Sequence, residues 1–159
     1  MGAIDDKVAA MGLELPPPPK LPPGVRLPFA FVNVIGDRAI VSGHGPQDPD
    51  GAISVRGIVG DGLSVDEGYA AARLVAMSML GSLQRELGSL DRIRQWVKAL
   101  GMVRSGPGFG EQPAVINGFS DLIIELFGDE VGRHARSAVG MSSLPFGMPV
   151  EIEAEVLID

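Results

Sequence analysis

The stretch GRHARSAVGMSSLPFGMPVEIEAEVLID, residues 132–159, carries the strongest structural signal in the chain. Residues 135–140 surround a single cation, Arg136, with small and β-branched side chains, and residues 150–156 alternate carboxylate with apolar side chains. Both patterns are typical of half-buried strands, in which successive side chains point to opposite faces. We therefore expect two paired strands in which Arg136 faces a glutamate across a hairpin.

This expected pair of an arginine with a glutamate allows two interpretations. Arginine can grip a substrate carboxylate with two parallel hydrogen bonds, and a nearby glutamate can hold a water or move a proton. The same residues can also form an ordinary cross-strand ion pair on a solvated face. The spacing alone favours the ion pair.

The composition of the chain limits the class of protein. The chain has 159 residues, of which 45% are apolar, and this suits one domain with one core. Its formal net charge of −7 disfavours a nucleic-acid partner, because a phosphate backbone would be repelled. The absence of cysteine excludes disulfides and thiolate catalysis. The two histidines, His44 and His134, are too few for a histidine-rich metal site.

The hydropathy pattern bears on location. The sequence has no run of about 18 apolar residues and no basic start followed by a short apolar segment. We therefore expect a soluble cytoplasmic protein without membrane contact.

The sequence divides into an N-terminal arm, residues 1–26, and a single body, residues 27–159. A short helix is expected at residues 4–11. The proline run at residues 16–24 cannot form a helix or a central strand and favours an extended polyproline II segment. Because apolar residues flank this run, we interpret it as an arm lying along the body rather than as a ligand for an SH3-type domain.

Local patterns in the body predict the order β-β-β-α-β-α-β-β, with two helices on one face of a mixed sheet. Ser64 and Glu67 form a capping-box signature for a helix that ends at Gly88, and its apolar stripe indicates that it lies on a sheet. Pro113 suits the first turn of a second helix, which should end near residue 128. Strands are expected at residues 28–35, 38–43, 53–58, 92–103, 135–140 and 150–156.

Three further features give weaker functional signals. The glycine-rich segment 105–110 lacks the lysine and the spacing of a phosphate loop, so a flexible turn is the better interpretation. Ser42 lacks the G-x-S-x-G context of a nucleophilic serine. His134 precedes Arg136 by two residues and shares its strand face if the strand extends that far, although a surface histidine is the simpler interpretation.

Taken together, several segments resemble the reactive intermediate deaminase family, also called the YjgF or L-PSP endoribonuclease family. The Arg136-Ser137 pair, followed by Leu144-Pro145 and then by Glu-Ile-Glu-Ala at residues 151–154, is the specific part of this resemblance. The arm resembles that of a longer-headed branch. The other resembling segments are residues 29–47, 64–87, 97–103 and 117–127.

The resemblance implies an α+β fold of the chorismate-mutase-like (bacillus) type, assembled as a homotrimer with its sites in clefts between subunits. It implies hydrolytic deamination of reactive imines or enamines, such as 2-aminoacrylate, to 2-keto acids and ammonia, without a metal or an organic cofactor. In this comparison Arg136 holds the substrate carboxylate and Glu151 positions the attacking water. Asn117 and the backbone of Gly43 line the same cleft.

Three residues of the expected site depart from the family pattern. Phe29 stands where active members usually have a tyrosine, His44 replaces the glutamine of Ser-Gly-Gln, and Ala138 replaces a common cysteine. These changes keep two alternatives open beside the deaminase. One is a non-catalytic trimer that binds small carboxylated metabolites. The other is an endoribonuclease, which only the older family name suggests.

Overall fold

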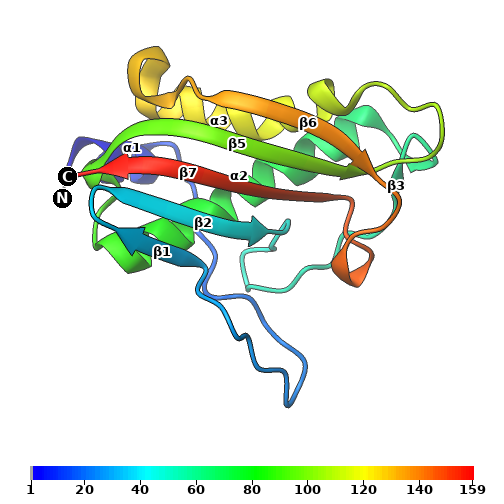
Figure 1. Ribbon diagram of the computed structural model, residues 1–159, viewed down its shortest axis with the longest axis horizontal. Helices are drawn as coiled ribbons and strands as arrows, with labels where there is room; N and C mark the ends of the chain where they lie inside the picture. Colours follow the sequence, from blue (N-terminus) through cyan, green and yellow to red (C-terminus); the bar gives the residue numbers. More distant parts are fainter. Residues whose placement is uncertain (1) are drawn as a thin grey trace.

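The computed structural model describes residues 2–159, so only residue 1 of the expected arm lies outside it. Its centre is a five-stranded mixed sheet in the order β1-β2-β7-β5-β6, in which only β5 and β6 run parallel (Figure 1). The mixed α+β class expected from the sequence is confirmed. The strands are β1 (Val32–Ile35), β2 (Arg38–His44), β5 (Ile93–Arg104), β6 (Ala135–Met141) and β7 (Val150–Ile158).

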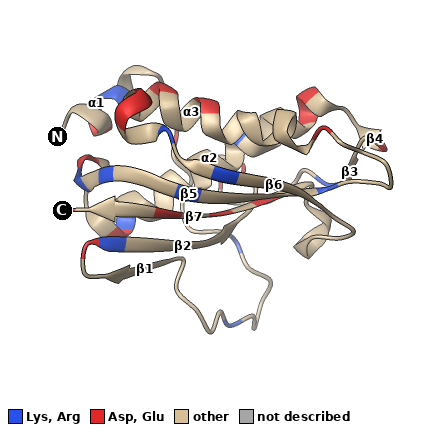
Figure 2. Ribbon diagram, turned by 45° about the horizontal axis from the view of Figure 1, so that its top comes forward, with Lys and Arg blue, Asp and Glu red and all other residues tan. Residues whose placement is uncertain are grey.

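Helices α2 (Val65–Leu87) and α3 (Gln112–Gly132) pack against each other and against one face of this sheet, as the sequence predicts. No α-helix of residues 2–159 covers the opposite face, which is called the open face below (Figure 2). None of the helices in this range is long and apolar enough to span a bilayer. The smaller elements are α1 (Ala3–Ala10), η1 (Leu90–Arg92), η2 (Pro145–Gly147) and the two short strands β3 (Ile58–Val59) and β4 (Gly62–Leu63).

Helix α2 begins and ends where its sequence signals predict. The Ser64 hydroxyl accepts the Glu67 amide while the Glu67 carboxylate accepts the Ser64 amide, which satisfies two backbone donors of the first turn. Gly88 ends the helix in the left-handed conformation, at φ 81°. The expected apolar stripe is buried against the sheet and α3 at Ala72, Val75, Ala76, Met79, Leu80, Leu83 and Leu87.

Helix α3 runs further than the sequence predicts. It has Pro113 in its first turn, and Gly128 interrupts it with φ 76° and ψ 168°, so the expected end near residue 128 marks a break in the helix. A last turn then continues to Gly132. Gly118 allows α3 to approach α2 closely, because a Cβ at this position would collide with the carbonyl group of Tyr69.

Two predicted strands differ from the observed ones. β1 begins at Val32 rather than at residue 28, since the Ser42 hydroxyl, 2.7 Å from the Ala30 carbonyl, satisfies that oxygen outside the strand ladder. Residues 53–57 form no strand, and β3 begins only at Ile58. Gly57 precedes it at φ 136°, a conformation that interrupts an extended chain.

The expected hairpin between residues 135–140 and 150–156 is wrong. β6 and β7 are separated by β5, which pairs with both of them. Helix α3 connects β5 to β6 as a crossover, and a crossover of this length joins parallel strands. Alternation separated the buried residues of β7 from its carboxylates correctly but carried no information about which strands are neighbours, and Arg136 and Glu151 do not share the face that was expected.

The N-terminal arm lies along the body. Pro16 and Pro17 accept hydrogen bonds from Arg85 and Gln47 at 2.9 Å and 3.1 Å. Lys20 pairs with Asp50 at 2.6 Å and fixes the next part of the arm. These bonds hold the proline run beside α2 and the loop that follows β2. The division at residue 26 stays a prediction.

Candidate functional site

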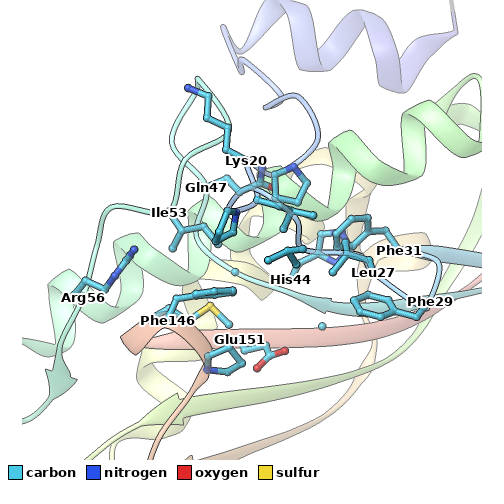
Figure 3. Close-up of a pocket in the computed structure, with 18 residues that line it drawn as sticks. Lys20, Leu27, Phe29, Phe31, His44, Gln47, Ile53, Arg56, Phe146 and Glu151 are labelled. Atoms are coloured by element: carbon cyan, nitrogen blue, oxygen red, sulfur yellow. The ribbon is translucent and has the colours of Figure 1, made fainter.

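The residues that the sequence predicts for the site fall into two groups in the structure. Phe29, Gly43, His44 and Glu151 line one cavity at the ends of β2 and β7, beside the arm (Figure 3). The second group lies on the edge strand β6 and on the outer part of α3, and it consists of Asn117, Arg136 and Ala138.

The cavity has a volume of about 490 Å³. The arm forms one wall, and the loop around η2 forms another (Figure 3). Its size is within the range of small-molecule sites in proteins. The lining residues outside the predicted set are mainly apolar: Pro19, Lys20, Leu21, Pro22, Val25, Leu27, Phe31, Gly45, Gln47, Ile53, Arg56, Pro145, Phe146 and Met148.

Glu151 lies over the backbone of Gly43 at this cavity. It belongs to the set of β7 residues that alternate with the buried Val150 and Ile152, so its side chain leaves the sheet on the open face. A Cβ at Gly43 would collide with the Glu151 carboxylate in its present position, so a larger residue there would displace this carboxylate. The glycine of Ser42-Gly43-His44 therefore makes room for a carboxylate at the edge of the cavity.

The Glu151 carboxylate is half-buried and lacks a stabilising partner within residues 2–159. Burial raises its pKa above the usual range, and the neighbouring Glu153 raises it further. A carboxylate with a raised pKa is a better proton acceptor than an ordinary glutamate. Glu151 is thus suited to act as a base toward a water molecule.

His44 is buried, and protein atoms occupy both of its ring nitrogens. Nδ1 donates to the Ser42 carbonyl at 2.6 Å, so Nε2 is the acceptor for the Ser82 hydroxyl at 2.8 Å. Burial, with a smaller contribution from the charge of Arg85, lowers the pKa of His44 to about 4. Arg85 also donates to Ser82 at 3.0 Å. The ring is neutral near pH 7 and can offer a ligand only its carbon surface.

Arg136 is held by neutral acceptors. Its Nη1 donates to Asn117 Oδ1 at 2.8 Å and to Ser120 Oγ at 3.1 Å, and its Nη2 lies 3.4 Å from the Pro113 carbonyl. No carboxylate within residues 2–159 forms an ion pair with it. Partial burial lowers its pKa, and the charge of Asp121 opposes this effect. The guanidinium is therefore oriented while its positive charge has no carboxylate in ion-pair contact within residues 2–159.

His134 supports this arrangement from the same side of β6. Its Nε2 is 3.0 Å from Ser120 Oγ, and its Nδ1 donates to the Gly132 carbonyl at 2.8 Å. Ser120 thus connects His134 to Arg136, so the two side chains lie on the same side, although β6 begins only at Ala135 and does not include His134. Ala138 is also on this face, where it packs against the core. Its register partner is Gly101 of β5.

Within one chain, Arg136 and Glu151 cannot act on the same small molecule. Arg136 aligns with Ala99 of β5, which aligns with Ala154 of β7. Ala154 is three residues from Glu151 in a regular part of β7, so Arg136 and Glu151 leave the sheet on opposite faces. The ion-pair interpretation of this pair is wrong for the same reason.

Other candidate chemistry from the sequence finds little support. No group of three or more His, Cys, Asp or Glu side chains within residues 2–159 could hold a metal ion. The Ser42 hydroxyl donates to the Ala30 carbonyl, and no base is bound to it in the described chain. In the glycine-rich segment 105–110, the Phe109 carbonyl accepts a bond from Gln112 at 2.9 Å.

Several residues of the cavity wall were not predicted from the sequence as site residues, among them Leu21, Val25, Phe31, Phe146 and Met148. None of them lies in an α-helix or a strand, and Phe146 belongs to the single turn of η2, so no periodic pattern marks them as lining a cavity. Only Phe146 could have been recognised from the sequence as a candidate for ligand contact, since it is an aromatic residue between Pro145 and Gly147 in a loop. Apolar residues in loops often contact a ligand or partner when they stay exposed.

Comparisons with known proteins give a consistent result. "Protein TCP17" of Trypanosoma cruzi is 45% identical over 141 residues, covering 84% of this chain and 88% of that protein. The crystal structure of Atu1372 from Agrobacterium tumefaciens, a protein of unknown function, has a TM-score of 0.85 at 39% identity, covering 98% of this chain and 92% of that one. A "putative endoribonuclease" of Shewanella oneidensis has a TM-score of 0.87 at 28% identity, covering 99% of this chain and 100% of that one.

The family profile described as "YjgF/chorismate_mutase-like, putative endoribonuclease" matches residues 5–151. This range includes most of the arm, the two helices α2 and α3 that pack on the sheet, and both groups of predicted site residues. The resemblance inferred from the sequence and the chorismate-mutase-like fold are thereby confirmed. The chain belongs to the YjgF/chorismate mutase-like family.

Proposed function

We propose that this chain is a cytoplasmic hydrolase that converts reactive imines or enamines of amino acids into 2-keto acids and ammonia. The site combines Arg136, Asn117 and Ala138 of one chain with Glu151, Gly43 and Phe29 of a second chain. Neither a metal nor an organic cofactor takes part.

The observation that carries this proposal is the pair of unneutralised charges. Arg136 is oriented by Asn117 and Ser120 without an ion-pair partner, and Glu151 has a raised pKa without a hydrogen-bond partner in the described chain. A charged group kept partly buried without a counter-ion is costly, so such groups cluster at functional sites. An imino acid supplies what both need: a carboxylate for Arg136 and an electrophilic carbon for a water held by Glu151.

The reaction needs only proton transfers and one water molecule. The imine enters as its protonated iminium form. Glu151 takes a proton from the water as the water oxygen bonds to C2 and the electron pair of the C=N double bond moves onto nitrogen, which gives a neutral carbinolamine. Glu151 then returns that proton to the nitrogen. The C–N bond breaks as the carbinolamine hydroxyl gives its proton to Glu151, so that the 2-keto acid and ammonia form, and the ammonia takes this last proton. A glutamate whose pKa lies above the usual range is better suited both to accept a proton from water and to donate it to nitrogen. An enamine enters the same path after it tautomerises to the imine.

The opposite faces of Arg136 and Glu151 favour a cyclic assembly. Contacts between different surfaces of identical chains close into a ring when the rotation permits it. The family resemblance suggests that the ring has three members. Each of three interfaces would then contain one complete site.

The experiment is to generate imines with an amino-acid oxidase or with threonine dehydratase and to measure 2-keto acid release with and without the protein. The proposal predicts faster release with the wild type and, with Arg136→Ala, release no faster than without protein. Arg133→Ala is the matched control, because Arg133 is an exposed arginine three residues away from Arg136. Equal release with and without the wild-type protein rejects the deaminase.

The second candidate is a trimer that binds carboxylated metabolites without catalysis. Phe29 favours it, because a phenyl ring at this cavity offers no hydroxyl to a bound carboxylate. Titration calorimetry with a 2-keto acid separates the two: binding without any imine hydrolysis supports the binding protein. An endoribonuclease is disfavoured by the net charge of −7 and by the occupied ring nitrogens of both histidines.

A further inference from the structure

The cavity beside Glu151 is larger than a site for 2-aminoacrylate requires. It measures about 490 Å³, a volume typical of sites that enclose much larger ligands. We propose that this cavity is the side-chain pocket of the site, and that the preferred substrates are imino acids with a large apolar side chain, aromatic or branched. This inference rests on the proposed function and specifies its substrate class.

The polar groups around the cavity are mostly occupied by the protein. Lys20 pairs with Asp50, Gln47 donates to the Pro17 carbonyl, and both ring nitrogens of His44 are bonded. Arg56 is exposed at the far end of the cavity from Phe29, and it donates to the adjacent Val55 carbonyl (Figure 3). Apart from Glu151 and, at the far end, Arg56, the wall therefore presents mainly carbon to a ligand.

Exposed apolar side chains are concentrated at this cavity. Eight large apolar side chains are exposed in residues 2–159, and four of the eight line the cavity. An exposed apolar cluster of this kind marks a binding surface rather than a solvated loop. The four and their exposed fractions are Leu21 (37%), Val25 (45%), Phe29 (52%) and Phe146 (59%).

Phe146 is held in a strained conformation at the cavity. It is the one non-glycine residue in the described chain with a positive φ, 58°. The turn around it is closed by bonds from Gly147 to Leu144 and from Met148 to Pro145, both 3.2 Å. Backbone strain of this kind is often kept where a side chain serves a function. A glycine would fit this backbone better but would remove the aromatic wall (Figure 3).

The wall of the cavity that the N-terminal arm forms is held in place by hydrogen bonds to the body. Pro16 and Pro17 are bonded to Arg85 and Gln47, and the Lys20 amide donates to the Gly51 carbonyl at 3.0 Å. Leu21 and Val25 follow directly along the same segment. A pocket whose walls are already in place binds an apolar side chain without first ordering a loop.

The test compares imines made by an amino-acid oxidase from phenylalanine or leucine with the imine made from alanine. Enclosing a large apolar side chain should raise kcat/KM at least about tenfold over the small substrate. Phe146→Gly should lower this ratio several-fold while its melting temperature stays equal or rises. Ile35→Ala is the matched control, because Ile35 is 57% exposed and lies outside the cavity. Its ratio should equal that of the wild type.

The possible failures point to different conclusions. If small and large imines are hydrolysed equally well, or Phe146→Gly leaves the ratio unchanged, the pocket assignment is overturned and the deaminase stands. If no imine is hydrolysed, titration calorimetry with phenylpyruvate and pyruvate decides. Tighter binding of phenylpyruvate, weakened by Phe146→Gly, supports the pocket and rejects the deaminase. Equal binding of both acids, or no binding, rejects the pocket as well.

Discussion

Arg136 and Glu151 lie on opposite faces of one sheet, and strand β5 separates the strands that carry them. Each is a charged, partly buried residue without an ion-pair partner in the described chain. Two such residues on opposite faces are complementary only between chains. The proposed function therefore depends on assembly as much as on side-chain chemistry.

Arg136→Ala should remove activity while the protein stays folded and assembled. A hydrogen bond to a charged group contributes roughly 1.5–3 kcal/mol, so loss of two should weaken substrate capture by more than about 100-fold. Arg136→Lys should retain only part of the wild-type activity, since an ammonium group cannot form two parallel hydrogen bonds to the substrate carboxylate. Steady-state kinetics and light scattering measure both properties. Full activity of the alanine variant, or its unfolding, would show that the role of Arg136 has been misread.

The assembled protein should have a mass of about 50 kDa, three times the 16.6 kDa of the chain. The family resemblance implies three chains, and a closed ring of three places Arg136 of each chain beside Glu151 of a neighbour. Light scattering coupled to size-exclusion chromatography measures this at micromolar concentration. A monomer under these conditions would remove the site between chains.

Phe29→Tyr should raise the rate on imines without a loss of stability. Phe29 is 52% exposed, so an added hydroxyl stays in water and causes no burial penalty. Although a strand was expected at residues 28–35, Phe29 is not a core residue of it, because β1 begins at Val32. One net hydrogen bond to the carboxylate contributes about 0.5–1.5 kcal/mol, or up to about tenfold in rate. An unchanged rate at an unchanged melting temperature would remove Phe29 from the site.

His44 should make the protein less stable in acid. Its pKa is lowered from 6.5 to about 4 in the folded chain, so the unfolded chain binds the proton first as the pH falls. The part of the unfolding free energy that depends on neutral His44 is therefore fully present above pH 6.5. It decreases by about 3 kcal/mol as the pH falls toward 4. His44→Gln should flatten this dependence in denaturant unfolding experiments between these pH values.

His134→Gln provides the comparison for this pH dependence. His134 is less buried than His44, and its pKa is lowered by the same main cause, desolvation. His134→Gln should therefore flatten the pH dependence of the unfolding free energy less than His44→Gln does. If His44→Gln and the wild type lose stability equally between pH 6.5 and 4, the titration of His44 does not limit stability in acid.

Local sequence signals predicted the elements of this fold better than their arrangement. The Ser64 capping box, Gly88 and Pro113 act within a single turn, and each lies where the pattern placed it. The order of strands depends on which faces pack together over long distances, and alternation in residues 150–156 carries no information about neighbours. This explains why two strands were expected to form a hairpin that β5 in fact separates.

The candidate site was predictable in its residue types and only partly in its geometry. The family resemblance selected Arg136 and Glu151, and the structure adds that one chain cannot bring them together. It also shows that His44 has no free ring nitrogen, which a sequence pattern cannot reveal. The apolar wall with Phe146 depends on how the arm lies on the body, and this was not apparent from isolated loop residues.

The central claim is that each site takes Arg136 from one chain and Glu151 from another. It is tested most directly by coexpressing Arg136→Ala chains with Glu151→Gln chains, each inactive alone. In randomly mixed rings about a quarter of the interfaces contain both intact residues, so about a quarter of wild-type activity should return. Coexpressing the double variant with Glu151→Gln chains is the control, because that mixture never contains an intact Glu151. Activity in the first mixture that is no higher than in the control would contradict a site shared between chains.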